Sequence, residues 1–169
     1  WGFVGGHWSR FGSFLYAPSS LIAYLQGRAK LEHRVGHTPL GALSVFALLL
    51  VLLAQVTTGL MSDDEIAFFG PLVRFVSGDT VALATSYHKN VGKFIVIALV
   101  VLHVAAIVFY KWVKKDNLVR PMVMGDKQMA ASLKVPQARD SVASRALALM
   151  VLAVCGGAVA WLVRLGSAF

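Results

Sequence analysis

Two histidines, His88 and His103, stand fifteen positions apart (88 to 103) in one long apolar stretch of the sequence. An ionisable group inside a membrane span is costly and is therefore a functional candidate. A neutral imidazole among the apolar neighbours of His103 needs a partner for each ring nitrogen, or it costs on the order of a few kcal/mol. Haem iron on one nitrogen and a backbone carbonyl on the other would satisfy both. A packing histidine bonded to a neighbouring helix is the alternative.

The spacing of these two histidines suits a pair of cofactors. On a regular α-helix, fifteen residues give a rise of roughly 22 Å and an angular offset of about 60°. Both rings are then expected on broadly one side of the helix, near opposite edges of the hydrocarbon layer. That geometry predicts two stacked haems, one per leaflet, with His88 and His103 as metal ligands; His88 also suits an ordinary boundary residue.

Second axial ligands are harder to find in this sequence. His7, His33 and His37 all fall in a basic connector, and we expect His7 and His33 to be solvated. His37 stands at the start of an apolar span, where it either reaches a cofactor or propionate or simply begins a helix. The partner ligands are therefore expected on helices outside these residues. Cys155 is the only cysteine, which excludes an internal disulfide and a Cys-x-x-Cys-His haem attachment.

Two lysines flank the expected outer position. Lys89 and Lys93 are placed to pair with haem propionates. Snorkelling of their ammonium groups to the membrane interface explains them equally well.

The elements that must position these residues are membrane helices. The chain has 169 residues, of which 57% are hydrophobic and 14% charged, and this is too apolar for an ordinary soluble domain. Three apolar runs are long enough to cross a bilayer. They cover residues 39–60, 86–113 and 146–163. The fold class predicted is therefore all-α, an integral membrane helical bundle.

Charge between the spans predicts the topology. The net charge is +8, and the basic residues collect in 7–38 and 111–145, whereas 61–87 is acidic with an apolar side. The positive-inside rule places the two basic segments in the cytoplasm and 61–87 outside. A nucleic-acid partner is not expected, because the basic residues do not interleave with exposed aromatics. Membrane lipid is the expected surrounding, and Pro18 predicts a short surface helix that starts after Ala17.

Several motifs resemble the bacterial cytochrome b561 family, which includes the membrane cytochrome b subunits of nickel-iron hydrogenases. The resemblance runs over residues 1–125, and 126–169 reads as a basic linker with an extra C-terminal helix. Its motifs are Trp1-Gly2-Phe3-Val4-Gly5, Gly36-His37-Thr38-Pro39-Leu40-Gly41-Ala42, His88, Leu102-His103-Val104-Ala105 and Asn117-Leu118-Val119-Arg120-Pro121-Met122.

This resemblance implies a four-helix core that holds two non-covalent b haems by bis-histidine ligation. The second span here would be the fourth helix, with His88 and His103 as ligands, and the first helix and nearly all of the second would precede Trp1. Many relatives show a double histidine where this chain has Tyr87-His88, so the register is less firmly defined at His88 than at His103.

Together these features predict an electron-transfer subunit rather than a catalyst by itself. Electrons would cross a bacterial inner (cytoplasmic) membrane, through a multi-pass protein, between the quinone pool and a periplasmic redox protein. That partner would be a c-type cytochrome or a hydrogenase-like subunit, docked on residues 61–87. A non-redox membrane anchor or assembly subunit is the alternative. A transporter is disfavoured because residues 86–113 show no mid-depth break.

Overall fold

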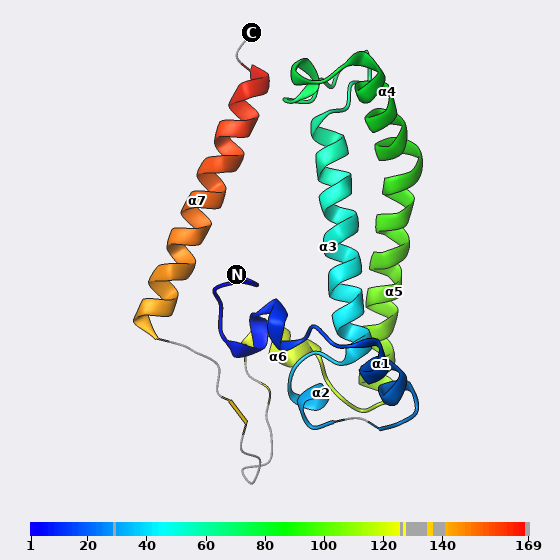
Figure 1. Cartoon of the computed structure of the whole chain (residues 1–169), viewed down its shortest axis with the longest axis vertical. Coiled ribbons are helices and arrows are strands. Elements are labelled where there is room, and N and C mark those ends of the chain that lie inside the picture. Colours follow the sequence, from blue (N-terminus) through cyan, green and yellow to red (C-terminus); the bar gives the residue numbers. More distant parts are fainter. Residues whose placement is uncertain (29, 126, 128–134, 137–140, 168–169) are drawn as a thin grey trace. The chain divides into compact units, whose positions relative to one another are not determined.

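The computed structural model describes residues 1–28, 30–125, 127, 135–136 and 141–167. The chain is 71% helical, and its described residues contain no strand, only an isolated bridge between Asp63 and Phe69. Three helices are long and apolar enough to cross a membrane: Pro39–Leu60, Gly78–Trp112 and Val142–Gly166. The predicted all-α membrane class is confirmed (Figure 1).

Helix α3 (Pro39–Leu60) has the bounds that the sequence predicts for the first span. The side chain of Thr38 accepts a hydrogen bond from the Gly41 backbone N–H at 3.0 Å. Pro39 follows it in the first turn, where a missing N–H costs nothing. A polar cap and a proline thus begin the helix where the apolar run begins.

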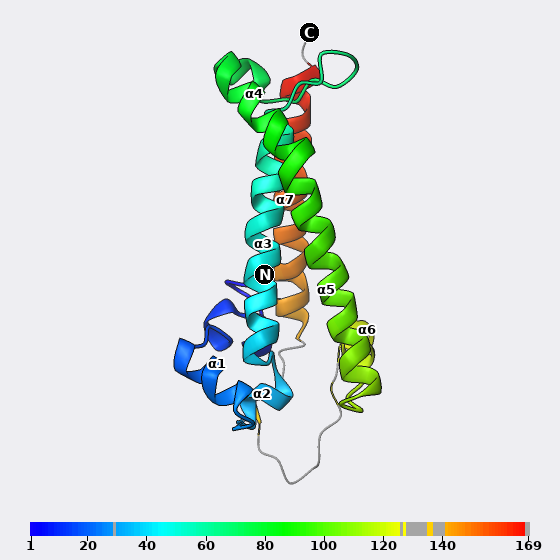
Figure 2. The same ribbon diagram turned by 90° about the vertical axis from the view of Figure 1, so that its right-hand side faces the viewer.

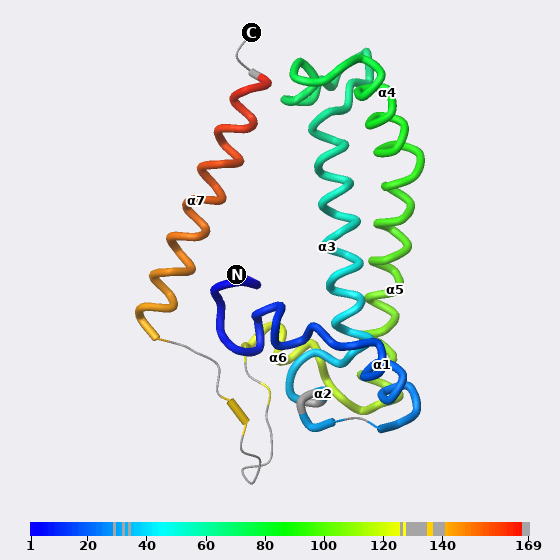
Figure 3. Tube along the Cα trace, viewed as in Figure 1, coloured from blue at the N-terminus to red at the C-terminus, as the bar shows by residue number. Residues whose placement is uncertain are grey.

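The second long helix starts earlier than predicted, at Gly78 instead of residue 86. Ser77 caps it, because its hydroxyl accepts from the Thr80 backbone N–H at 3.3 Å. The helix consists of α4 (Gly78–Tyr87), a π-helical turn η4 (His88–Gly92) and α5 (Lys93–Trp112). Its path is continuous through the π-helical turn (Figure 3). The segment expected to be a loop over 61–87 therefore ends at Ser77.

The third long helix, α7 (Val142–Ser167), also extends beyond the predicted 146–163. Ser141 and Ser144 bond each other reciprocally: the Ser144 backbone N–H donates to the Ser141 hydroxyl at 3.2 Å, and the Ser141 N–H donates to the Ser144 hydroxyl at 2.9 Å. This cap lies outside the apolar run, so hydropathy alone does not detect it. Most of the predicted linker before it lies outside the described residues.

Contacts divide the chain into two compact units, one of Trp1–Phe46 and Val101–Ala148 and the other of Ala47–Val100 and Leu149–Phe169. The first unit holds the short helices of the connector and α6 (Val119–Met124). The connector helices are η1 (His7–Ser9), η2 (Phe11–Ser13), α1 (Pro18–Leu25) and α2 (Glu32–Val35). Helix α1 starts after Ala17 as predicted.

An aromatic cluster forms the core of the first unit. Phe14 is buried, and its ring centroid lies 5.6 Å from that of Phe46 at the start of α3. Phe11 lies 5.7 Å from the same ring. The connector therefore packs against α3 through apolar contacts and is not an extended, solvated segment.

The second unit holds the end of α3, η3 (Val73–Phe75), α4 and the start of α5. Figures 1 and 2 both show the end of α3 beside η4, and hydrogen bonds between them are described below. Most apolar side chains of the long helices face outward, and no residue of α5 is buried by the described chain. Lipid contact accounts for such a surface, because a bilayer solvates apolar side chains that water would not.

Candidate functional site

His88 opens the π-helical turn, and a backbone carbonyl holds its ring. The Nδ1 atom of His88 lies 2.9 Å from the carbonyl oxygen of Gln55 in α3. A carbonyl only accepts hydrogen bonds, so Nδ1 carries the proton and donates it. The lone pair is then on Nε2, which has no hydrogen-bond partner within the described chain. Nε2 is therefore the nitrogen available to a metal.

The side chain of Gln55 returns a second bond to the same residue. Its Nε2 donates to the backbone carbonyl of His88 at 3.1 Å. Its Oε1 is buried and has no hydrogen-bond partner among the described residues. Sequence reasoning missed Gln55, although a single amide within an otherwise apolar span is a detectable signal.

Two glycines make room for this contact. A β-carbon at Gly59 would lie 2.7 Å from Cε1 of the His88 ring and 3.1 Å from its Nδ1. A β-carbon at Gly92 would meet the Oε1 atom of Gln55 and would lie 2.8 Å from the Tyr87 ring. Neither position accepts a side chain without a shift of its neighbours. The two helices therefore approach closely at the His88 ring.

His103 has different surroundings. It lies in α5 and is half-buried, and no hydrogen bond to either ring nitrogen is present within the described part of the chain. Its flanking residues Leu102 and Val104 are exposed. Neither nitrogen of this imidazole thus has a hydrogen-bond partner among the described residues.

The arrangement fits an axial haem ligand better than a site built from protein ligands alone. Among the described residues, no three His, Cys, Asp or Glu side chains gather as a metal site would require. A porphyrin would supply four ligands to an iron, so a single imidazole from this helix would be enough on this chain's side of a haem. At His88 the second ring nitrogen already has the carbonyl partner that a ligating histidine normally has.

His37 lies near the start of α3 and stacks on Phe14, with ring centroids 4.3 Å apart. Its backbone carbonyl accepts the Tyr16 hydroxyl at 2.9 Å. Burial lowers the pKa of His37 below its usual value, and its Nδ1 is buried without a described partner. The ring is thus neutral and packed.

The expectation that His33 is solvated is wrong. His33 is only 2% exposed, and its Nδ1 accepts the Lys30 backbone N–H at 3.2 Å. The rings of Tyr16 and Tyr24 lie edge-on to it at 4.9 and 5.9 Å. The connector buries this imidazole between two tyrosines, a tertiary contact that local charge does not reveal. His7 is half-buried against Trp8 instead.

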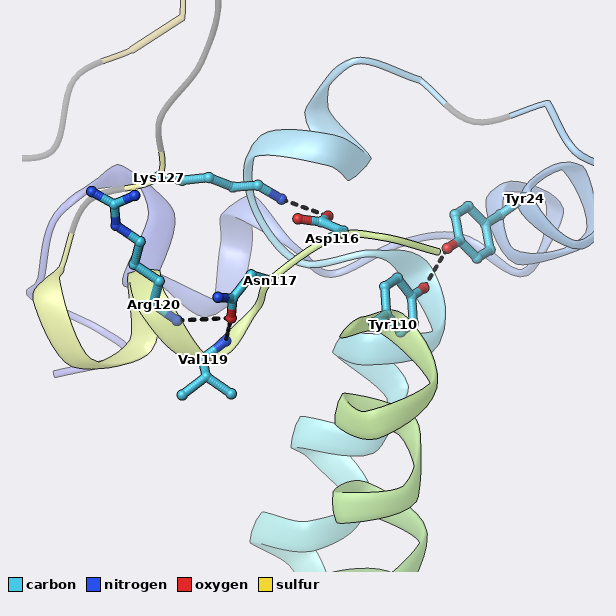
Figure 4. A network of polar contacts seen from close by, with 7 residues as sticks. All are labelled: Tyr24, Tyr110, Asp116, Asn117, Val119, Arg120 and Lys127. Carbon is cyan, nitrogen blue, oxygen red and sulfur yellow. Dashed lines mark hydrogen bonds and ion pairs between the residues drawn. The ribbon is translucent and has the colours of Figure 1, made fainter. Parts of the chain in front are cut away.

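A pair of tyrosines joins α1 to the end of α5 (Figure 4). The hydroxyl oxygens of Tyr24 and Tyr110 are 2.6 Å apart. Burial, together with the bond to Tyr110, raises the pKa of Tyr24 to about 12. Beyond them, Lys127 pairs with Asp116 at 2.9 Å, and the Asn117 side chain accepts the backbone N–H groups of Val119 and Arg120 at the start of α6.

Lys89 and Lys93 are both exposed. The ammonium of Lys93 lies 4.8 Å from the centre of the Phe94 ring. Lys89 lines a shallow depression of about 490 Å³ together with Asp63, Glu65 and Asn90. Neither lysine has a described carboxylate partner within ion-pair distance.

The segment between α3 and α4 is folded by its own polar groups. Backbone N–H groups of Phe68, Ala67 and Ile66 donate to the carboxylate of Asp64 at 2.8, 2.9 and 3.1 Å, and they lower its pKa to about 2. The Asp63 backbone N–H donates to the Thr85 hydroxyl at 3.1 Å. Ile66 is left 93% exposed at the tip. The segment is thus an ordered, acidic surface with an apolar tip.

An all-helical chain with three membrane-length helices defines an integral membrane protein of the helical type. A sequence profile described as prokaryotic cytochrome b561 matches residues 7–125. This range covers more than half of the chain, and the chain belongs to the prokaryotic cytochrome b561 family. Comparisons with curated proteins and with solved structures gave no match.

Membership gives the function at a general level. The family consists of membrane b-type cytochromes that bind b-type haem and act in electron transfer. Its members lie in lipid and exchange electrons with a quinone or another redox partner. The chain is accordingly a bacterial membrane protein.

Proposed function

We propose that this chain passes electrons across the bacterial inner membrane through two b haems, with His88 and His103 each supplying one axial ligand. The observation that carries the proposal is the His88 ring, whose Nδ1 donates to the Gln55 carbonyl and whose Nε2 is left free as a ligand. A histidine bonded in this way has a fixed tautomer and raised basicity, as metal-ligating histidines do.

A six-coordinate haem supplies one-electron transfer and no open position for a substrate. The residues of the chain therefore orient and insulate rather than perform bond chemistry. In a bilayer, the apolar residues that flank His103 in α5 would keep water away from that imidazole. We include Lys89 and Lys93 as cations for propionate groups, and His37 as a neutral, packed imidazole toward the inner cofactor.

The two ends of the protein suit different partners under this proposal. The acidic segment around Asp63 and Asp64 offers a periplasmic redox protein, such as a c-type cytochrome or a hydrogenase-like subunit, an ordered surface on the His88 side. The quinone pool is proposed to exchange electrons on the His103 side. The opposite ligands are proposed to come from helices outside this chain, and the cytochrome b561-like membrane domain to cover residues 1–125.

The absorbance spectrum of the full-length protein in detergent tests this proposal. Reduction with dithionite is expected to give the sharp Soret and alpha bands of low-spin b haem, and a redox titration is expected to resolve two midpoints. A protein that folds and carries no haem would instead be a non-redox membrane anchor. One midpoint with half of the expected iron would leave only a single-haem protein.

A further inference from the structure

We propose that Gln55 is a positioning residue that, with Gly59 and Gly92, fixes the orientation of the His88 ring and so sets the reduction potential on that side of the membrane. This inference rests on the proposed function, because it assumes that His88 ligates a haem. It concerns three residues of α3 and η4 that sequence reasoning had not connected with the histidine.

The first step is the pair of reciprocal bonds. The main chain of Gln55 accepts from His88 Nδ1 at 2.9 Å, and its side chain donates to the His88 carbonyl at 3.1 Å. The first bond fixes the ring and the second fixes the backbone that carries the ring. Together they leave the imidazole little freedom to tilt about either its side-chain or its main-chain bonds.

The second step explains why the His88 ring can reach the backbone carbonyl of Gln55. In an α-helix, side chains point back toward the helix N-terminus, so a side chain at residue 59 would cover the carbonyl of residue 55. Gly59 leaves that carbonyl open, and its hypothetical β-carbon would lie 2.7 Å from the ring. The Thr58 hydroxyl bonds mainly to Ala54 at 2.7 Å and only at 3.2 Å to Gln55. The Gln55 carbonyl is thus kept accessible to His88.

The third step is the π-helical turn. A π-helical turn bonds residue i to residue i+5 and changes the carbonyl partners along the helix, and such turns occur frequently at functional sites. Here the carbonyl of His88 accepts from both Lys93 N–H and Gln55 Nε2. Gly92 lies in this turn and leaves room for the amide of Gln55. The π-helical turn therefore places the His88 carbonyl, and with it the His88 ring, within reach of Gln55.

A purely structural role for Gln55 predicts a different result. An interhelical hydrogen bond that only stabilises the fold changes the melting temperature and leaves the redox properties of the bound haem alone. A positioning role changes the strength of the Nδ1–H bond, which sets the basicity of the ligand and hence the reduction potential.

The experiment compares the variant Gln55→Met with Leu53→Met in the full-length, haem-loaded protein. Met at position 55 keeps the length of the side chain and removes the donor, whereas Leu53 is an exposed residue of the same helix. We expect Gln55→Met to shift one of the two midpoints upward and to alter the low-spin EPR signal of that haem, with the other midpoint unchanged. Leu53→Met is expected to leave both midpoints at the parent values.

A second pair of variants covers the case in which Gln55→Met fails to fold. Gly59→Ala is expected to lose or shift the same haem, whereas Gly157→Ala, which meets nothing within 4 Å, is expected to match the parent. Nitrogen NMR of the His88 ring in haem-free protein is expected to show the Nδ1–H tautomer.

Unchanged midpoints in both Gln55→Met and Gly59→Ala would overturn the inference, as would an equal shift of both haems. A haem-free parent protein would instead overturn the proposed function, so the two failures are distinguishable.

Discussion

The surroundings of His88 and those of His103 differ in which groups orient the ring. The neighbouring helix holds His88 by a carbonyl at 2.9 Å, and two glycines allow the close approach. His103 has exposed apolar neighbours and no hydrogen bond from the described residues. The described chain thus orients the His88 ring by a hydrogen bond and forms none with the His103 ring. The following predictions test this difference, in order of expected effect.

The largest effect is expected for His88→Leu. It removes the proposed ligand and leaves the Gln55 backbone carbonyl without the Nδ1–H donor of the ring. We expect one of two haems to be lost and the apoprotein to be destabilised by about 1–3 kcal/mol, the cost of leaving a buried polar group unsatisfied. Haem content by pyridine haemochrome and unfolding in detergent measure the two effects. If the variant retained both haems, His88 would not be a haem ligand.

His103→Leu should separate the two effects. It is expected to remove the other haem, but to change the stability of the apoprotein by less than about 0.5 kcal/mol, because no described hydrogen bond is lost. The same haem assay and unfolding measurement apply. A destabilisation as large as that of His88→Leu would show that His103 is also held by the chain, and the contrast between the two histidines would disappear.

Tyr110→Phe tests the end of α5 beyond His103. Loss of the bond between Tyr24 and Tyr110 is expected to cost about 1 kcal/mol. It should also lower the pKa of Tyr24 from about 12, while burial, the larger cause, keeps this pKa above 10, as read from tyrosinate absorbance. Because the folded state raises this pKa, the stabilisation is complete below pH 10 and is lost as the pH rises through about 12. Tyr87→Phe is the control, and equal titration curves for the two variants would contradict the prediction.

The smallest effect is expected on the His88 side, in the titration of Asp64. Three backbone donors lower its pKa to about 2, so the ionised form belongs to the folded segment. Its contribution is present above the ordinary value of 3.8 and is lost as the pH falls through about 2. Carbon-13 NMR of the carboxyl group should give a midpoint near 2. A midpoint near 3.8 would mean that residues 61–77 are not ordered by this carboxylate.

Much of the fold could be predicted from the sequence. An uninterrupted apolar run and a Thr-Pro start determine α3, so its predicted and observed bounds agree. Hydropathy identifies the residues that suit the hydrocarbon layer, whereas capping serines determine the residue at which a helix starts. The helices that start after Ser77 and Ser141 therefore exceed their predicted spans.

The site was less accessible to sequence reasoning. Haem ligation by His88 and His103 stays a prediction, because the spacing names the residues and no described contact shows a metal. The fixed tautomer of His88 depends on a carbonyl from residue 55, and any residue type supplies a carbonyl. The π-helical turn was also missed, because no single residue specifies it. Its i→i+5 bonds mean that the 60° offset assumed for a uniform α-helix does not carry over unchanged.

The bonds between Gln55 and His88 also bear on assembly within the membrane. Sliding α3 along η4 by one helical turn, about 5.4 Å, would separate the amide, the ring and both carbonyls from their partners. Where water does not replace the lost bonds, each unsatisfied buried group costs about 1–3 kcal/mol. This polar contact therefore favours one register of α3 against η4, and it does so without a bound cofactor.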